Sequence, residues 1–356
     1  MSILYKDEHS GIELEHPVAD FYDQELLEKP ETIYRIDDGE RFYYTLGPGN
    51  EPTFYGSITS IKGKTSSTPR PIIQKEISMG TKAFKSYVRN RQQLGSFLHQ
   101  ECARAAIEGS YDFDAIKDRI EYYASGWQAK DISAWKERIA KTTGEYPAET
   151  LLFDIIQSIS KPPVEYTDAR YGKKSWVYET RSCLAAWMEF IKAYRVKFLA
   201  VELPLSHPDG FASTIDYVLE RDKNNYTEKT PPEKRKRITT ILDIKTGNIF
   251  PGYEVQLFAN QRAFNYHYPT IKIDRLENWT YRFSQTTPFY VKDQTGKCTD
   301  KQLDAILHIW KQQGKTKPRD ITVLNGTVKA GESAMERYQT IPVEEFIKQK
   351  HESINQ

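Results

Sequence analysis

The sequence predicts a mixed α/β fold in which helices pack on a central mixed β-sheet. Two long helical patterns, 82–108 and 174–194, precede a region of alternating β-branched and apolar residues, 196–245. Another helical pattern follows at 253–268. This order of helices, then strands, then helices is typical of a domain in which helical layers cover a single sheet.

The remaining elements are predicted from local patterns and turn residues. Residues 1–40 are rich in Asp and Glu and have no strong period, so we expect a peripheral arm or a loosely structured cap. The turn signal GPGNEP separates two predicted strands, 41–46 and 53–61. Further helices are predicted at 113–124, 130–141, 148–159, 299–314 and 343–350, and further strands within 196–205, 211–219, 238–245, 275–285 and 288–292.

The bulk composition allows a sizeable core and excludes several classes of protein. The chain has 356 residues, 38% of them hydrophobic, and 50 Lys and Arg against 49 Asp and Glu, which excludes an overall basic coat for nucleic acid. Three cysteines and seven histidines lack the spacing of a disulfide framework or a structural zinc site. The N-terminus has no apolar signal segment, and no apolar run is long enough to span a membrane. We therefore expect a soluble protein of the reducing cytoplasm, without a membrane partner.

Positive charge is concentrated in one segment, 62–91. Eight Lys and Arg residues face a single acid there, Glu76. The segment leads into the helix 82–108, so we expect it to bind phosphate groups through Lys82, Lys85, Arg89 and Arg91. A solvated surface is the ordinary alternative for such a charge run.

Three charged residues, Asp216, Asp243 and Lys245, lie on two predicted neighbouring strands. Successive side chains of a strand point to opposite faces, so Asp243 and Lys245 share one face with Ile241, while Leu242 and Ile244 take the other. An isolated charge that faces a core is costly. These groups therefore predict a divalent-cation site with a lysine beside it to meet a water molecule or a phosphate.

Two upstream residues are candidates to join this site. His99 lies on one face of the helix 82–108 with the small residues Gly95, Ala103 and Ala106, which would let the helix approach a sheet closely. Glu202 is predicted to lie on a strand face shared with Phe198 and Ala200.

The order of these residues resembles the PD-(D/E)XK nuclease superfamily, and more narrowly its RecB-type and lambda-exonuclease-like branches. The matching features are G-x-x-x-H at 95–99, V-E at 201–202, Asp216, D-x-K-T-G at 243–247 and a helix that carries Gln256. The resemblance implies a restriction-endonuclease-like core over 81–270. Residues 1–80 would form an N-terminal extension, and 271–356 a C-terminal extension packed on the core.

The resemblance also implies a role for each residue. His99, Asp216, Asp243 and the backbone carbonyl of Ile244 would coordinate Mg²⁺ or Mn²⁺, a cation that activates water and screens phosphate oxygens. Lys245 would orient or deprotonate the attacking water and stabilise charge on the phosphate. Glu202 lies where many relatives carry an acid.

Gln256 would contact the DNA backbone or brace Lys245. Two positions depart from the family pattern: Ser213 replaces the usual glycine before the aspartate, and Asn260 replaces the usual tyrosine after the glutamine. Asn260 keeps its hydrogen-bonding groups without an aromatic face, so we expect it to contact DNA together with Gln256.

Each candidate also has an ordinary structural interpretation. His99 would be a core histidine with satisfied hydrogen bonds, and Asp216 a partner in a simple ion pair. Asp243 and Lys245 would pair with each other, Glu202 would be a solvated acid on an edge strand, and Gln256 would be a surface residue.

The expected function is metal-dependent hydrolysis of DNA, exonucleolytic by resemblance, in phage or bacterial recombination or repair. An annealing protein or a helicase is a possible further partner, since no ATPase motif is present. The alternatives are a structure-selective or nicking endonuclease on the same core, and a catalytically silent DNA-binding scaffold.

Overall fold

The computed structural model of this chain describes residues 3–6, 13–15, 27–37, 40–65, 68–120, 122–123, 165–168, 172–226, 229–282, 287–313, 316–324 and 338–354. All elements named below lie within these residues. No helix among them is both long and apolar enough to cross a membrane.

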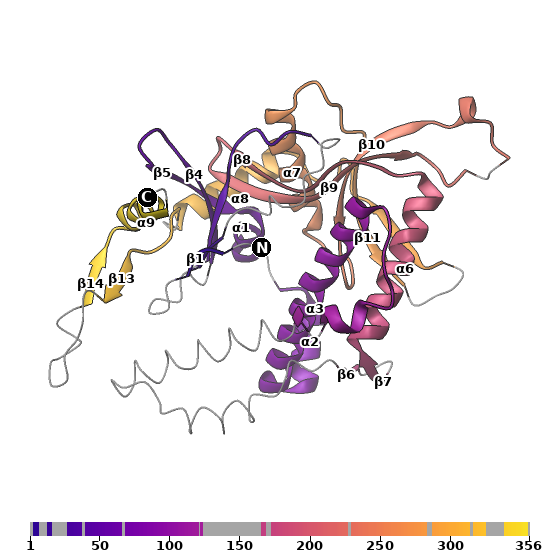
Figure 1. The fold of residues 1–356 in the computed structure, drawn as a ribbon, viewed down its shortest axis with the longest axis horizontal. Helices are drawn as coiled ribbons and strands as arrows, with labels where there is room; N and C mark the ends of the chain where they lie inside the picture. The colour runs from indigo at the N-terminus through magenta and orange to yellow at the C-terminus, as the bar shows by residue number, and fades with distance from the viewer. Residues whose placement is uncertain are drawn as a thin grey trace.

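Ten strands form one mixed sheet at the centre of the molecule (Figure 1). The order across the sheet is β1-β2-β3-β4-β5-β9-β10-β11-β12, and β8 pairs with β9. The strands are β1 (Ile3–Lys6), β2 (Glu13–Glu15), β3 (Tyr34–Asp37), β4 (Arg41–Leu46), β5 (Pro52–Ser57), β8 (Lys197–His207), β9 (Phe211–Asp222), β10 (Arg237–Ile244), β11 (Arg275–Tyr281) and β12 (Phe289–Asp293). Two separate pairs, β6 (Glu165–Asp168) with β7 (Gly172–Ser175) and β13 (Ile321–Leu324) with β14 (Tyr338–Ile341), complete the strands described.

The sheet divides at β9. The first residues of β9, Phe211 and Ala212, pair in parallel with β5, whereas its second half, from Tyr217 to Asp222, pairs antiparallel with β10. Residues 213–216 lie between these two pairings. Asp216 therefore stands at the point where the N-terminal strands and β10 diverge.

Helices cover both faces of the sheet. They are α1 (Ile58–Thr65), α2 (Arg70–Met79), α3 (Thr81–Glu108), α6 (Trp176–Tyr194), α7 (Tyr253–His267), α8 (Asp300–Gln312) and α9 (Val343–Ile354), with a short 3₁₀ helix at Pro232–Lys234. The helices α3 and α6 lie side by side (Figure 1) and share a hydrophobic core with Leu242 and Ile244. The helices α1, α7, α8 and α9 share the other core with Ile241. The predicted alternation along β10 is confirmed, and so is a central mixed sheet flanked by helices.

Most of the predicted elements are confirmed, but two predictions are wrong. The predicted strand 53–61 ends at Ser57 and continues as α1, because Ile58 and Ile61 are spaced for one helical face and both are fully buried. Residues 1–40 contain β1, β2 and β3, which pair in sequence with β4, so they are not merely a loose arm. In the predicted helix 113–124, residues 116–120 and 122–123 are helical, and the predicted helices 130–141 and 148–159 lie outside the described residues.

One hydrophobic core crosses the expected boundaries at residues 80 and 270. It contains Tyr44 from β4, Leu257 from α7 and Phe346 from α9, all nearly inaccessible to solvent. The expected extensions at both ends of the chain thus pack into the same core as the central segment.

Candidate metal centre

His99 projects from α3 at the contact between this helix and the sheet. A methyl group in place of the hydrogen of Gly95 would lie 3.0 Å from Thr246 Oγ1, so the small residue does permit a close approach. The side chain of His99 is 28% exposed, and its Nδ1 lies 3.4 Å from Asp216 Oδ2. The interpretation as a satisfied core histidine does not fit this position, because the imidazole faces a groove.

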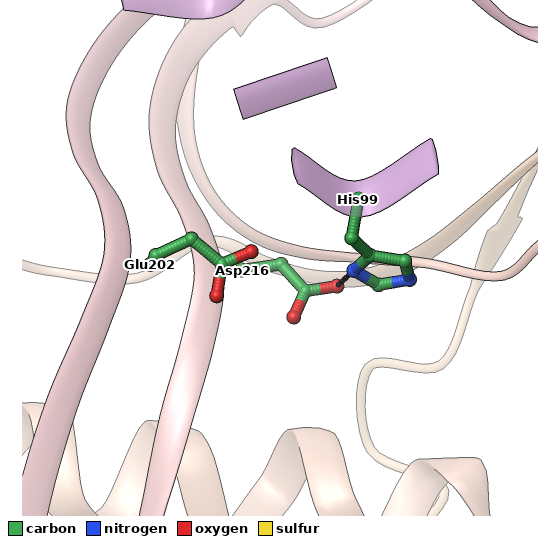
Figure 2. A group of neighbouring side chains, drawn as sticks. All are labelled: His99, Glu202 and Asp216. Carbon is green, nitrogen blue, oxygen red and sulfur yellow. Dashed lines mark ion pairs between the residues drawn. The ribbon is translucent and has the colours of Figure 1, made fainter. Parts of the chain in front are cut away.

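Glu202 and Asp216 are cross-strand neighbours. The pairs Val201 with Tyr217 and Leu203 with Ile215 flank them in the register of β8 and β9. Figure 2 shows the carboxyl group of Asp216 between that of Glu202 and the imidazole of His99. One ligand atom from each of the three residues lies within 4.8 Å of the other two. Three distant segments of the chain therefore place one nitrogen and two oxygen donors around a common point.

The backbone at Glu202 is unusual for a strand. Its φ angle is 49°, in the left-handed region that residues other than glycine rarely occupy. The strand is also irregular between Phe198 and Ala200, where the register shifts. The prediction that Glu202 shares a face with these two residues is therefore wrong: Phe198 packs against the core of α3 and α6, and Ala200 lies in the other core. Strain of about 1–3 kcal/mol at such a position is typical of functional sites.

The two carboxyl groups lie in an environment that disfavours their charged forms. Burial, followed by the negative charges of Asp216 and Asp243, raises the pKa of Glu202 well above its ordinary value, although Arg41 opposes the shift. Burial also raises the pKa of Asp216 to about 6, against the charge of His99 and a hydrogen bond from the Ile244 amide. A cation between these groups would relieve both penalties.

Asp243 occupies a hydrogen-bonded network beside this cluster. Lys245 Nζ lies 2.7 Å from Asp243 Oδ1 and 2.6 Å from Oδ2. Gln256 Nε2 donates to Oδ1 over 3.2 Å, and Asn278 Nδ2 donates to Oδ2 over 2.7 Å. Gln294 in turn donates to Asn278 Oδ1 over 2.8 Å. The alternative in which Asp243 and Lys245 pair with each other matches this geometry.

Lys245 remains a cation in this setting. Burial opposes its charge, but Asp243 and Asp216 outweigh that effect and raise its pKa. Its Nζ also lies 4.5 Å from the centre of the Tyr253 ring, a cation–π contact. The lysine is thus held between a carboxylate and an aromatic face.

Most of the predicted site residues line one groove. His99, Glu202, Asp216, Ile244, Lys245 and Gln256 all contribute to it, together with Ser213. Gln256 is 9% exposed and bonded to Asp243, so the surface interpretation of this residue is wrong. Asp243 lies behind the groove wall, close enough for its charge to act on both carboxyl groups of the cluster.

The residues predicted to contact DNA fall into three groups. Arg91 lines the groove, where its guanidinium binds both oxygens of Glu179 and the carbonyl of Thr246. The side chains of Lys82, Lys85 and Arg89 are exposed on α3 outside the groove lining.

Asn260 lies elsewhere: it is 1% exposed within α7 and does not line the groove. The position of Asn260 does not allow the predicted contact with DNA, because a buried side chain is out of reach of a polymer on the surface.

Four further residues belong to the site but were not predicted. Asn278 and Gln294 complete the network around Asp243, Tyr253 contacts Lys245, and Arg41 acts electrostatically on Glu202. Asn278 lies in the predicted strand 275–285, to which no site residue was assigned. The parallel register of β10 and β11 places it opposite Asp243. No local signal marks this position, because β11 also contains the polar residues Arg275, Glu277 and Thr280.

Comparisons with known proteins add no identification. No protein-family model matches this chain, and no curated protein matches it.

Proposed function

We propose that this chain hydrolyses phosphodiester bonds of DNA with the help of a divalent cation, Mg²⁺ or Mn²⁺. One observation carries the proposal: His99, Glu202 and Asp216 converge from α3, β8 and β9 in the wall of one groove, next to Lys245, which is paired with Asp243 behind that wall. The order of the elements adds support. The strands β8, β9 and β10 are antiparallel neighbours, so the segments that carry Glu202, Asp216 and Asp243 lie side by side, and α7 then leads to β11, which is parallel to β10.

The donor set fits such a cation. Two carboxylates and one imidazole are ligands that Mg²⁺ and especially Mn²⁺ accept. The raised pKa values of Glu202 and Asp216 indicate negative charge that the protein alone compensates poorly. When bound, the cation would lower the pKa of a coordinated water and screen the phosphate oxygens.

The protein groups around the cluster have separate roles. The Ile244 amide and His99 orient the Asp216 carboxylate. Lys245 supplies a compact positive charge for the phosphate, and its raised pKa favours this role over that of a general base at neutral pH. Gln256 and Asn278 hold Asp243, which in turn holds Lys245.

The exonucleolytic mode, and a place in phage or bacterial recombination or repair with an annealing protein or helicase, rest on the resemblance alone. Linear and covalently closed circular DNA distinguish the modes when each is incubated with the protein in Mg²⁺, Mn²⁺ or EDTA. Loss of linear DNA only would support an exonuclease, and cutting of both would support an endonuclease. Binding without cutting under every condition would support the scaffold alternative and overturn the proposed function.

Two substitutions test the assignment of the site. Asp216→Asn should abolish cleavage, since it removes a charged ligand, and Lys245→Met should reduce it by at least about 100-fold, the loss typical of one electrostatic group. Lys64→Met is the matched control, because Lys64 belongs to α1 and does not line the groove. Cleavage that survives Asp216→Asn would show that the site is misassigned.

A further inference from the structure

The groove extends well beyond the cluster of His99, Glu202 and Asp216. It encloses about 2380 Å³ and receives residues from β3 and β4, from α2 and α3, from the segment after β10, and from β11 and β12. Pockets for small molecules usually enclose about 300–1,000 Å³. The size of this groove therefore favours a polymer over a single small ligand.

Aromatic side chains are the most distinctive part of its lining. Among the described residues, ten Phe and Tyr line the groove, with nine Lys and Arg against five Asp and Glu. Several of the cations already have acidic partners: Arg91 binds Glu179, and Arg104 and Arg119 both lie within 4 Å of Glu101. The positive charge available for phosphates is modest, whereas aromatic rings are numerous, although Tyr43, Phe97 and Tyr281 among them are buried.

Three of these rings form cation–aromatic pairs: Tyr253, which contacts Lys245, and two others. Lys75 Nζ of α2 lies 3.7 Å from the centre of the Tyr87 ring on α3, and the guanidinium of Arg282 lies 4.5 Å from the Tyr290 ring on β12. Tyr290 is 40% exposed. Because each cation lies over one face of its ring, a nucleobase would stack on the opposite face, with the charge of the cation near the adjacent phosphate.

A duplex would use such a surface poorly. Its bases are stacked on one another, and its binding to protein depends largely on phosphate neutralisation by Lys and Arg. The exposed cations suited to that task, Lys82, Lys85 and Arg89, lie outside the groove lining. A single strand has unstacked bases that can lie against Tyr87 and Tyr290.

We propose that the groove binds single-stranded DNA and leads it to the cluster of His99, Glu202 and Asp216, with bases stacked on Tyr87 and Tyr290. The identification of the polymer as DNA rests on the proposed function. The single-strand preference rests on the aromatic lining and its paired cations.

Binding can be measured apart from cleavage by fluorescence anisotropy in EDTA. The probes are a fluorescein-labelled oligonucleotide of about 12 deoxythymidines, within the range of single-strand site sizes, and a blunt duplex of the same length. The full-length protein should bind the single strand at least about tenfold more tightly than the duplex, the effect of one or two stacked bases.

Substitutions locate the effect in the groove. Tyr290→Ala and Tyr87→Ala should each weaken single-strand binding by about tenfold, whereas Tyr290→Phe should retain it, because stacking needs the ring and not the hydroxyl. Tyr266→Ala is the matched control: Tyr266 is 56% exposed but does not line the groove, so its loss should leave binding unchanged. Equal melting temperatures of the variants exclude a folding defect.

The two proposals fail in different ways. Equal or tighter binding of the duplex, or unchanged single-strand binding by Tyr290→Ala, would overturn the single-strand groove even if Mn²⁺ supports cleavage. Single-strand binding that depends on Tyr87 and Tyr290, without cleavage of any DNA in Mn²⁺, would support the groove and overturn the proposed hydrolysis.

Discussion

Replacing Asn278 with leucine tests how the protein holds Asp243. Asn278 is completely buried on β11. Its Nδ2 donates to Asp243 Oδ2 over 2.7 Å, and its Oδ1 accepts a hydrogen bond from Gln294 over 2.8 Å. These two hydrogen bonds form a relay from Gln294 through Asn278 to Asp243. Leucine has a similar volume but can make neither bond, so Asn278→Leu removes the relay with little change in packing.

The structure sets the size of the effect. A hydrogen bond to a charged group contributes about 1.5–3 kcal/mol and one between neutral groups about 0.5–1.5 kcal/mol. Their combined loss predicts a decrease of about 2–4.5 kcal/mol in the free energy of unfolding, a large share of the roughly 5–15 kcal/mol of an ordinary domain. We also expect a lower kcat for DNA cleavage, because Asp243 would no longer hold Lys245 in one position.

Urea unfolding of a double-mutant cycle is the appropriate assay. Gln294→Leu alone leaves the Oδ1 atom of Asn278 without its donor, and Asn278→Leu alone leaves the Nε2 atom of Gln294 without its acceptor. The double variant leaves neither amide stranded, so its destabilisation should be smaller than the sum of the two by about 0.5–3 kcal/mol, the usual range for coupled neighbours. Additive effects with unchanged cleavage would refute the relay.

Three further predictions concern α3 and its contacts. Gly95→Ala should lower cleavage, because its methyl group would lie 3.0 Å from Thr246 Oγ1 and push α3 away from the sheet. The added change Thr246→Ala should restore activity. A Gly95→Ala variant with full activity would contradict this prediction. In cation-free protein, burial raises the pKa of Asp216 from 3.8 to about 6. The folded protein therefore binds this proton more tightly than the unfolded chain does. The resulting stabilisation is fully present below pH 3.8 and is lost as the pH rises through 6. Asp216→Asn should therefore raise the melting temperature at about pH 8 and have little effect at about pH 3.5, and equal shifts at both would refute the assignment. Arg91→Met should destabilise by about 3 kcal/mol in urea unfolding, because the buried Glu179 carboxylate loses its cationic partner and keeps, among the described residues, only the hydrogen bond from Tyr281. Arg89→Met, at an exposed position of the same helix, should stay within about 0.5 kcal/mol. Similar losses in both would argue against a specific role for the Glu179 pair.

Much of the fold could be predicted from local patterns. The helix 82–108 and the strands around Asp216 and Asp243 have periodicities of one kind over many residues, so local chain geometry decides them. The segment 53–61 failed because Ile58 and Ile61 fit either a strand or a helix over so short a run, and only burial against the sheet distinguishes the two.

The sequence by itself determined which groups were available: an imidazole on a helix with small residues, an aspartate in one strand, and D-x-K at the end of the next. These depend on residue type and spacing, which the chain carries directly. Only the tertiary structure decided that the sheet divides at Asp216, that Glu202 takes a left-handed conformation, and that Asn278 lies opposite Asp243. The physical reason is that strand partners and register are set by hydrogen bonds and packing between distant segments, which no local pattern specifies.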